Sequence, residues 1–262
     1  MIARAVEVEA TLFQDYTYFD KTTLDGLSWQ AYTTIISGLT PEGQTLLEKF
    51  AWQPERQPEG ERSKSFLHSM RVGGLVLKAS GEDADLAVAA ALHDMGKSRD
   101  DVRELTILPR RLSDEERAVV SRHSQYGHLD LEGCLWDKEL EDLSRFVALN
   151  HHTKRPAWLS MSEELLWDYT SLTQIADRTD ALLLDWERTY KADRMTAEGL
   201  LHADGTLNMD ATLKEILRED VGRRFLGIKV SDIVEIGHMY MPKPDWIQEQ
   251  VALMRQKQTA TS

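Results

Sequence analysis

Cysteine is nearly absent from this 262-residue chain, in which Cys134 is the only one. A disulfide within the chain is therefore impossible, as is a zinc site built from several thiolates of one chain. Long apolar runs are also missing, because no stretch approaches the roughly 20 residues that span a bilayer. The opening MIARAVEVEA lacks the apolar core of a secretory signal. We therefore expect a cytoplasmic protein without a membrane partner.

Basic residues are fewer than acidic ones, 31 against 44, which gives a formal net charge of -13. This charge disfavours long-range attraction to duplex nucleic acid or to an anionic membrane. It does not exclude small phosphorylated substrates, because bound divalent cations can dominate the local field of a site. The content of 42% hydrophobic and 29% charged residues is typical of a globular protein.

Alternating strand patterns are scarce, whereas apolar residues recur at helical spacing from Phe66 onward. The expected fold class is mostly α, a helical bundle. Capping-box spacing at Ser113 with Glu116 and at Ser160 with Glu163 marks two helix starts. The clearest predicted helices span 66–79, 83–95, 137–150 and 162–184, and breaks or bends are expected at Gly96, Pro109, Gly127 and Pro156.

The ends of the chain differ from its middle. Residues 1–60 form an N-terminal extension to which the sequence assigns no role, with a short hairpin expected in VEVEATLFQDYTYF and a short helix in TPEGQTLLEKFAW. The stretch QPERQPEGERSKS is rich in proline, glycine and charge, which is typical of an exposed linker. The main domain is expected over residues 61–255, followed by a flexible tail over 256–262.

Histidines are concentrated in one part of the chain, since six of the eight lie between His68 and His152. The most informative is His93, followed directly by Asp94 in AAALHDMGK. An imidazole and a carboxylate suit borderline divalent metals, and a carboxylate can bridge two ions. The apolar run predicts a buried helix that ends at this pair. Lys97 would lie one turn further on, where its ammonium group could meet a phosphate oxygen.

Each histidine also has a structural interpretation when it is taken alone. His68 could be a core histidine, and His123 and His128 could be solvated at a helix entry. His151 and His152 are adjacent, so only at a helix end could both approach one metal. Asp177 and Asp180 share a helical face, so that one could be a ligand and the other a helper or a solvated carboxylate. The remaining two histidines, His202 and His238, lack companions and are interpreted as structural or surface residues.

Taken together, the order of His68, His93-Asp94 and Asp177 resembles the HD superfamily of phosphohydrolases. The additional His123 and His151-His152 resemble its HD-GYP branch. The segments ILPRRLSDEERAVVSRHSQYGH, IADRTDALL and RTYKADRMTAEGLLHADGTLNMD are similar to segments of that branch. The likeness covers roughly residues 65–217.

Two positions depart from the branch. The His-His pair is followed by TKRPAWLS instead of a Gly-Tyr-Pro loop, so we expect poor hydrolysis of cyclic di-GMP. Lys64 stands one turn before His68, where members with three metals carry a glutamate. A positively charged residue disfavours a third ion there, and the expected number of ions is two.

The resemblance implies a ligand set for two divalent ions, iron or manganese. One ion would be held by His68, His93, Asp94 and Asp177, and the other by Asp94, His123, His151 and His152. Metal-activated water would attack the phosphorus atom, with Asp94 bridging the ions and Lys97 neutralising a phosphate oxygen. Weaker candidates for phosphate contacts are Arg155, Arg178 and Arg188, which surface ion pairing would equally explain.

The function implied is a dinuclear phosphodiesterase that acts on a cyclic dinucleotide or a related nucleotide. Two alternatives stay open on the sequence. One is a phosphomonoesterase or nucleotidase of the wider HD superfamily, and the other is a nucleotide-binding sensor without hydrolysis. An intact ligand set favours an enzyme, because a pure binding module has no need of a complete dinuclear site.

Overall fold

The computed structural model describes residues 24–51, 63–106, 108, 110, 112–184, 195–196, 198–202, 207–220 and 222–240. The predicted hairpin, most of the predicted linker, Pro109, Arg188 and the tail lie outside the described residues. The described elements are α2 (Leu24–Ile36), α3 (Pro41–Ala51), α4 (Lys64–Ala79), α5 (Ala84–Ala91), η1 (Met95–Ser98), α6 (Asp100–Thr106), α7 (Asp114–Val120), α8 (His123–Asp130), α9 (Lys138–Asn150), α10 (Met161–Thr179), η2 (Asp180–Leu184), α12 (Met209–Leu217), η3 (Arg218–Asp220), β1 (Arg224–Phe225), β2 (Ile228–Lys229) and α13 (Val230–Met239).

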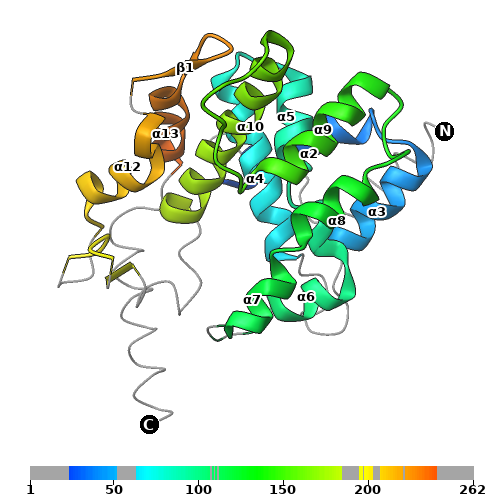
Figure 1. Ribbon diagram of the computed structural model, residues 1–262, viewed down its shortest axis with the longest axis horizontal. Helices are drawn as coiled ribbons and strands as arrows, with labels where there is room; N and C mark the ends of the chain where they lie inside the picture. Colours follow the sequence, from blue (N-terminus) through cyan, green and yellow to red (C-terminus); the bar gives the residue numbers. More distant parts are fainter. Residues whose placement is uncertain are drawn as a thin grey trace.

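The fold is a helical bundle, as the sequence predicts. Helices α4 and α5 lie at its centre, with α2, α9 and α10 packed around them (Figure 1). Helices α12 and α13 and the small β1–β2 hairpin flank α10, while α3, α6, α7 and α8 lie on the opposite side. Among the described residues, the two larger apolar clusters lie between α2, α3, α4 and α5 and between α4, α10 and α13. The site is therefore built on packed helices rather than on a sheet.

Two adjacent glycines let α4 approach its neighbours closely. A Cβ atom on Gly73 would lie 2.6 Å from the Cβ atom of Ala91 in α5, and one on Gly74 would lie 2.5 Å from the carbonyl oxygen of Leu27 in α2. Larger residues at either position would push these helices apart. The close contacts fix α4, which carries His68, against α5, which leads to His93.

The predicted helix starts are confirmed. Ser113 and Ser160 each cap a helix and form a complete capping box with the glutamate three residues later. The short helix expected in TPEGQTLLEKFAW is also present, as α3. The predicted segment 162–184 is helical, but its last residues from Asp180 form a π-helical turn.

Two details of the prediction are wrong. Helix α5 ends at Ala91, four residues before the expected end, and the chain then tightens into the 3-10 turn η1. Gly127 is not a bend, since it lies within α8, where a Cβ atom would be 3.3 Å from both the Cβ atom of Ala148 and the backbone nitrogen of Gly96. Its small size allows close packing of α8 against α9 and η1. In the sequence, a glycine needed for close packing cannot be distinguished from one that ends a helix.

A hairpin of two short strands was also absent from the prediction. Arg224 pairs with Lys229 and Phe225 with Ile228, around a turn that contains Gly227 at φ 80°. Two-residue strands give no alternation that a sequence pattern can detect. Among the described helices, none combines the length and the apolar character that a membrane crossing needs.

Candidate metal centre

Five helices or helix ends bring the predicted ligands together. They come from α4 (His68), the turn after α5 (His93 and Asp94), the first residue of α8 (His123), the end of α9 (His151 and His152) and the last turn of α10 (Asp177). Most of these side chains are buried, whereas His152 is exposed and Asp177 is 21% exposed. The structure brings all seven predicted residues close together.

The approach of η1 to α8 sets the distance between Asp94 and His123. A Cβ atom on Gly96 would lie 2.0 Å from the carbonyl oxygen of His123 and 2.5 Å from the backbone nitrogen of Gly127. Only glycine fits between these backbone atoms. The glycine that follows the His-Asp pair therefore has a structural task, which is to let the pair reach the start of α8.

The first ligand group consists of His68, His93 and Asp94, with Asp177 beside it. The Nε2 atom of His68 lies 3.1 Å from Asp177 Oδ1 and 3.8 Å from Asp94 Oδ2. The Nε2 atom of His93 lies 3.5 Å from the same Asp94 Oδ2. These nitrogen and oxygen atoms all face one point.

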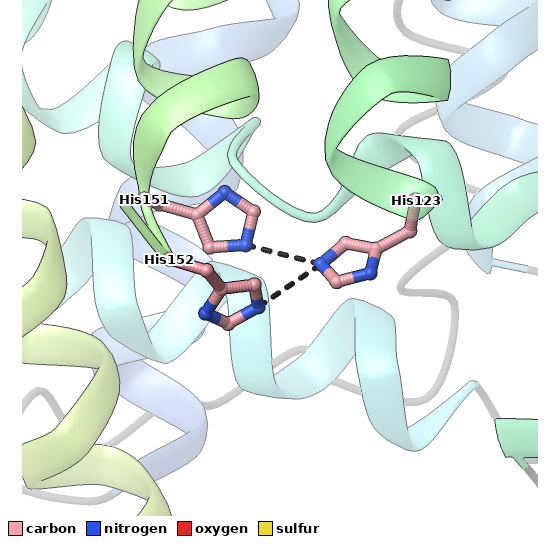
Figure 2. Close-up of side chains that lie close together, drawn as sticks. All are labelled: His123, His151 and His152. Atoms are coloured by element: carbon pink, nitrogen blue, oxygen red, sulfur yellow. Dashed lines mark hydrogen bonds between the residues drawn. The ribbon is translucent and has the colours of Figure 1, made fainter. Parts of the chain in front are cut away.

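The second ligand group consists of His123, His151 and His152, whose rings converge in Figure 2. The Nε2 atom of His123 lies 3.1 Å from that of His151 and 3.2 Å from that of His152. It also lies 3.2 Å from Asp94 Oδ1, and His151 Nε2 lies 3.6 Å from that oxygen. Two ligand atoms held about 2.1 Å from one ion at a right angle are separated by about 3 Å. The spacing of this group therefore fits a metal ion.

Hydrogen bonds on the far side of the rings fix their tautomers. The Nδ1 atoms of His93, His123 and His151 lie 2.7, 2.6 and 2.8 Å from the backbone carbonyl oxygens of the residues three positions earlier. A carbonyl oxygen only accepts, so each Nδ1 must carry the proton. In the neutral rings, each Nε2 then presents a lone pair to the others and to Asp94. A cation placed among these lone pairs would be bound by them.

Asp94 lies between the two groups, and each of its carboxylate oxygens faces one of them. Oδ2 faces His68 and His93, and Oδ1 faces His123 and His151. Oδ1 is buried and has no hydrogen-bond partner among the described residues. A buried carboxylate oxygen without a partner is costly, and a metal ion would satisfy it. The donor set therefore fits divalent metal, and the Asp94 carboxylate would help to hold it.

His68 differs from the other ligands because a carboxylate, not a carbonyl, holds its Nδ1 atom. Nδ1 donates to Asp180 Oδ2 at 2.6 Å, and Arg71 donates from Nε and Nη2 to the two oxygens of Asp180 at 2.5 and 3.0 Å. Asp180 is fully buried. Of the two candidate aspartates, Asp177 is thus the one positioned as a ligand, and Asp180 orients the histidine.

Burial separates the protonation states of the histidines. It lowers the pKa of His93 to about 4 and that of His151 to about 4, so both rings are neutral at pH 7. Burial would also lower the pKa of His68, but the charges of Asp180 and Asp177 outweigh it and raise that pKa to about 9. The metal-free His68 is therefore an imidazolium ion that donates to both aspartates. The other two rings are ready to bind metal.

We expect uptake of the ion at the first group to release one proton near pH 7, because His68 must lose its Nε2 proton to become a ligand. Because the pKa of His68 is raised, the apparent affinity of the first group for its metal ion should increase about tenfold per pH unit up to about pH 9 and then level off. In the metal-free protein, the stability from the protonated ring is fully present below about pH 6.5 and is lost as pH rises through about 9. Calorimetric titration of Mn²⁺ in buffers of different ionisation enthalpy measures the proton count, and zero release at pH 7 would contradict this protonation state.

Each described cationic side chain that was predicted to act in catalysis or phosphate binding contacts a different group in the structure. Lys97 donates from Nζ to Asp94 Oδ2, so it offsets the charge of that carboxylate in this structure. Burial would raise the pKa of Asp94, but Lys97 and His93 outweigh it and keep that pKa well below its usual range. Arg155 forms an ion pair with Asp168 at 2.6 Å. Arg178 donates from Nε to the carbonyl oxygen of Ile216 at 2.7 Å.

Other sequence interpretations can also be placed. Lys64 is exposed at the first residue of α4. His128 is half-buried, and its Nδ1 atom lies 3.3 Å from the carbonyl oxygen of Arg145. Both His202 and His238 are exposed, as expected for surface residues.

A cleft of about 1130 Å³ opens beside the ligand groups and is lined by His151, His152 and Asp177. The loop after α9 supplies one side of the cleft, including Arg155, and the segment after α12 supplies Arg218 and Arg223. Sequence reasoning missed Arg71, Arg218 and Arg223. For Arg71, the sequence signal was its position three residues after His68, which places both on one helix face but does not identify Asp180 as the partner.

Comparison with known protein families finds a match over the region that carries the candidate metal ligands. Residues 66–183 match the family model of the HD domain. No curated protein and no solved structure matches the chain. The matched residues include every one of the seven ligands, and HD domains bind divalent metals and belong to a superfamily of metal-dependent hydrolases. Residues 66–183 are therefore similar to the HD domain, and they include buried histidine and aspartate groups that could hold metal.

Proposed function

We propose that this protein is a two-metal phosphodiesterase that hydrolyses a small, nucleotide-derived diester. The observation that carries the proposal is the position of Asp94, whose two oxygens each face one ligand group. Divalent ions of first-row metals such as iron or manganese suit ligands of this mixture of nitrogen and oxygen. When bound, such a pair supplies an activated water and stabilises charge on the entering and leaving oxygens.

The residues of the chain would divide the remaining tasks. His68 is held by Asp180, and the other buried rings are held by carbonyl groups, so their ligand atoms are positioned before any metal enters. Lys97 has an ammonium group next to the bridging carboxylate, from which it could reach a phosphate oxygen once the ions neutralise Asp94. Arg155 and Arg178 line the cleft, where substrate would lie. Arg188 stays a candidate from the sequence alone.

Replacement of His151 by alanine should weaken the second ion selectively. Its Nε2 atom contributes to the second group only, and loss of a ligand removes a direct bond to the ion. Even damage to groups behind the ligands costs about 10- to 100-fold in metal affinity, so we expect a loss of at least that size. Competition with a fluorescent chelator measures both affinities. His128→Ala removes an imidazole from α8 outside the ligand groups and should leave both values unchanged, whereas equal affinities in His151→Ala would remove His151 from the site.

The experiment that tests the function is hydrolysis of a substrate panel by metal-loaded protein, with bis(4-nitrophenyl) phosphate, linear and cyclic dinucleotides, and nucleoside monophosphates. We expect turnover of diesters, with slow turnover of cyclic di-GMP because TKRPAWLS replaces the Gly-Tyr-Pro loop. Turnover of monophosphates alone would favour the nucleotidase alternative. Binding of nucleotides without any turnover in the metal-loaded protein would favour the sensor.

A further inference from the structure

A second group of cations, outside the loop after α9, also lines the cleft. We call Arg178, Arg218 and Arg223 the arginine cluster. Arg178 is on α10, next to the ligand Asp177, whereas Arg218 and Arg223 come from the segment between α12 and β1, which lies beside α10 in Figure 1. The latter two residues lie beyond the matched HD domain, which ends at residue 183. The cleft therefore joins the metal ligands to cations that a different part of the chain supplies.

Carboxylates neutralise this cluster only in part. Arg223 Nη1 lies 2.9 Å from Asp220 Oδ1, and the other oxygen of Asp220 lies 3.9 Å from Arg178 Nη2. Arg218 forms an ion pair at 2.6 Å with Glu215, which does not line the cleft. The chain as a whole has more acidic than basic residues and a formal net charge of -13, whereas this part of the cleft has more basic than acidic ones. Such an excess indicates an anionic ligand.

Arg178 has a donor without an acceptor. Its Nε donates to a backbone carbonyl group, but Nη2 is buried and has no hydrogen-bond partner among the described residues. The side chain is 16% exposed, so water reaches only part of it. A buried, charged donor that lacks an acceptor is costly, and an oxyanion in the cleft would supply one.

Arg218 has an unusual backbone. It ends α12 at φ 46° and ψ -122°, in a region that residues with a side chain rarely adopt and that glycine would occupy more easily. Strained residues of this kind concentrate at binding sites. The residue with this strained backbone has its guanidinium side chain at the wall of the cleft.

We propose that the arginine cluster binds a second phosphate group of the substrate, one that is not cleaved. This inference rests on the proposed function, since the first phosphate is the diester hydrolysed at the metal ligands. Guanidinium groups bind phosphate oxygens through charge-assisted and bidentate hydrogen bonds, which suits them to this task. The substrate would then carry two phosphates, as a cyclic dinucleotide or a linear dinucleotide with a terminal phosphate does, and a nucleoside monophosphate would engage only one of the two sites.

Linear dinucleotides with one internal diester provide a matched test. ApA carries the internal phosphate alone, whereas pApA and ApAp add a terminal phosphate at one end or the other. We expect kcat/KM for cleavage of the internal bond to be about 10- to 100-fold higher for one of the two phosphorylated forms, the effect of one or two charge-assisted hydrogen bonds. Arg218→Gln, Arg223→Gln and the double variant that combines them should reduce this preference through KM.

Arg224→Gln is the control, because Arg224 is exposed, does not line the cleft and donates to the carbonyl oxygen of Gly227. It removes the same charge next to Arg223 and should keep the full preference. Both arginines to be replaced have half-exposed side chains, 57% and 51%, so the variants should fold. A preference of about one in the wild type, or a preference that survives in the double variant, would overturn the proposal.

A binding measurement separates this proposal from the proposed function. Calorimetry with pApA, ApAp and ApA on Asp94→Asn protein needs no turnover, and we expect one phosphorylated form to bind about 10- to 100-fold more tightly. Equal affinity of all three would overturn the second phosphate site even if bis(4-nitrophenyl) phosphate were hydrolysed by the wild type. Tighter binding without any hydrolysis by metal-loaded wild type would support the arginine cluster and contradict the phosphodiesterase.

Discussion

Asp94→Asn should abolish hydrolysis while leaving the helical fold in place. The substitution keeps the size of the side chain but removes the charge and replaces one carboxylate oxygen by an NH2 group, which has no lone pair for a metal. Metal ions supply several kcal/mol of transition-state stabilisation, and each 1.36 kcal/mol is a factor of ten in rate. We therefore expect kcat/KM for bis(4-nitrophenyl) phosphate to fall by about 10³-fold or more, together with metal content.

The measurement combines steady-state kinetics, element analysis and circular dichroism. Asp142→Asn is a matched control, because Asp142 is 63% exposed and pairs with Lys138 at 3.2 Å on the surface of α9. It should retain full activity and two ions. An Asp94→Asn protein that keeps both its ions and its activity would exclude this residue as the bridge.

Gly96→Ala should damage the fold and the site together. Its new Cβ atom would lie 2.0 Å from a carbonyl oxygen and 2.5 Å from a backbone nitrogen, and neither can move without shifting α8. Inserting atoms into packed regions typically costs about 1–3 kcal/mol, and backbone contacts this short place the expected loss of unfolding free energy at about 3 kcal/mol or more. A shift of α8 would also move His123 away from Asp94.

Urea unfolding followed by circular dichroism measures this loss, and chelator competition measures the second ion in the same protein. Gly127→Ala should cost less, since its Cβ atom would meet its neighbours at 3.3 Å. In Gly38→Ala, the Cβ atom would be 3.5 Å from the nearest atom, an ordinary contact, so this variant should be close to wild type. Equal stability of all three variants would show that α8 is not held by the glycine at position 96.

The residues that converge in the structure could be named from the sequence because their types and order resemble those of the HD superfamily. His93 and Asp94 follow a run of apolar residues, and the adjacent His151 and His152 lie at a helix end, as their spacing required. The helical fold followed in the same way from apolar residues at helical spacing. Asp177 and Asp180 were recognised as a pair, but their roles became distinct only through the hydrogen bond between Asp180 and His68.

Features that depend on contacts between distant segments could not be predicted. Arg71 pairs with an aspartate 109 residues away, and nothing in the local sequence specifies that partner. Gly127 was interpreted as a bend because glycine weakens helices, whereas its environment is a tight crossing of helices. The arginine cluster is formed only when the segment after α12 lies against α10, so its members are unremarkable surface arginines in the sequence.

The direct test of the two-metal centre is anomalous diffraction, combined with element analysis, on protein prepared without chelators. We expect two fully occupied ions per chain, one on each side of the Asp94 carboxylate. The first should be coordinated by His68, His93 and Asp177, and the second by His123, His151 and His152. A single ion, a third fully occupied ion, or two ions that Asp94 does not bridge would contradict the account.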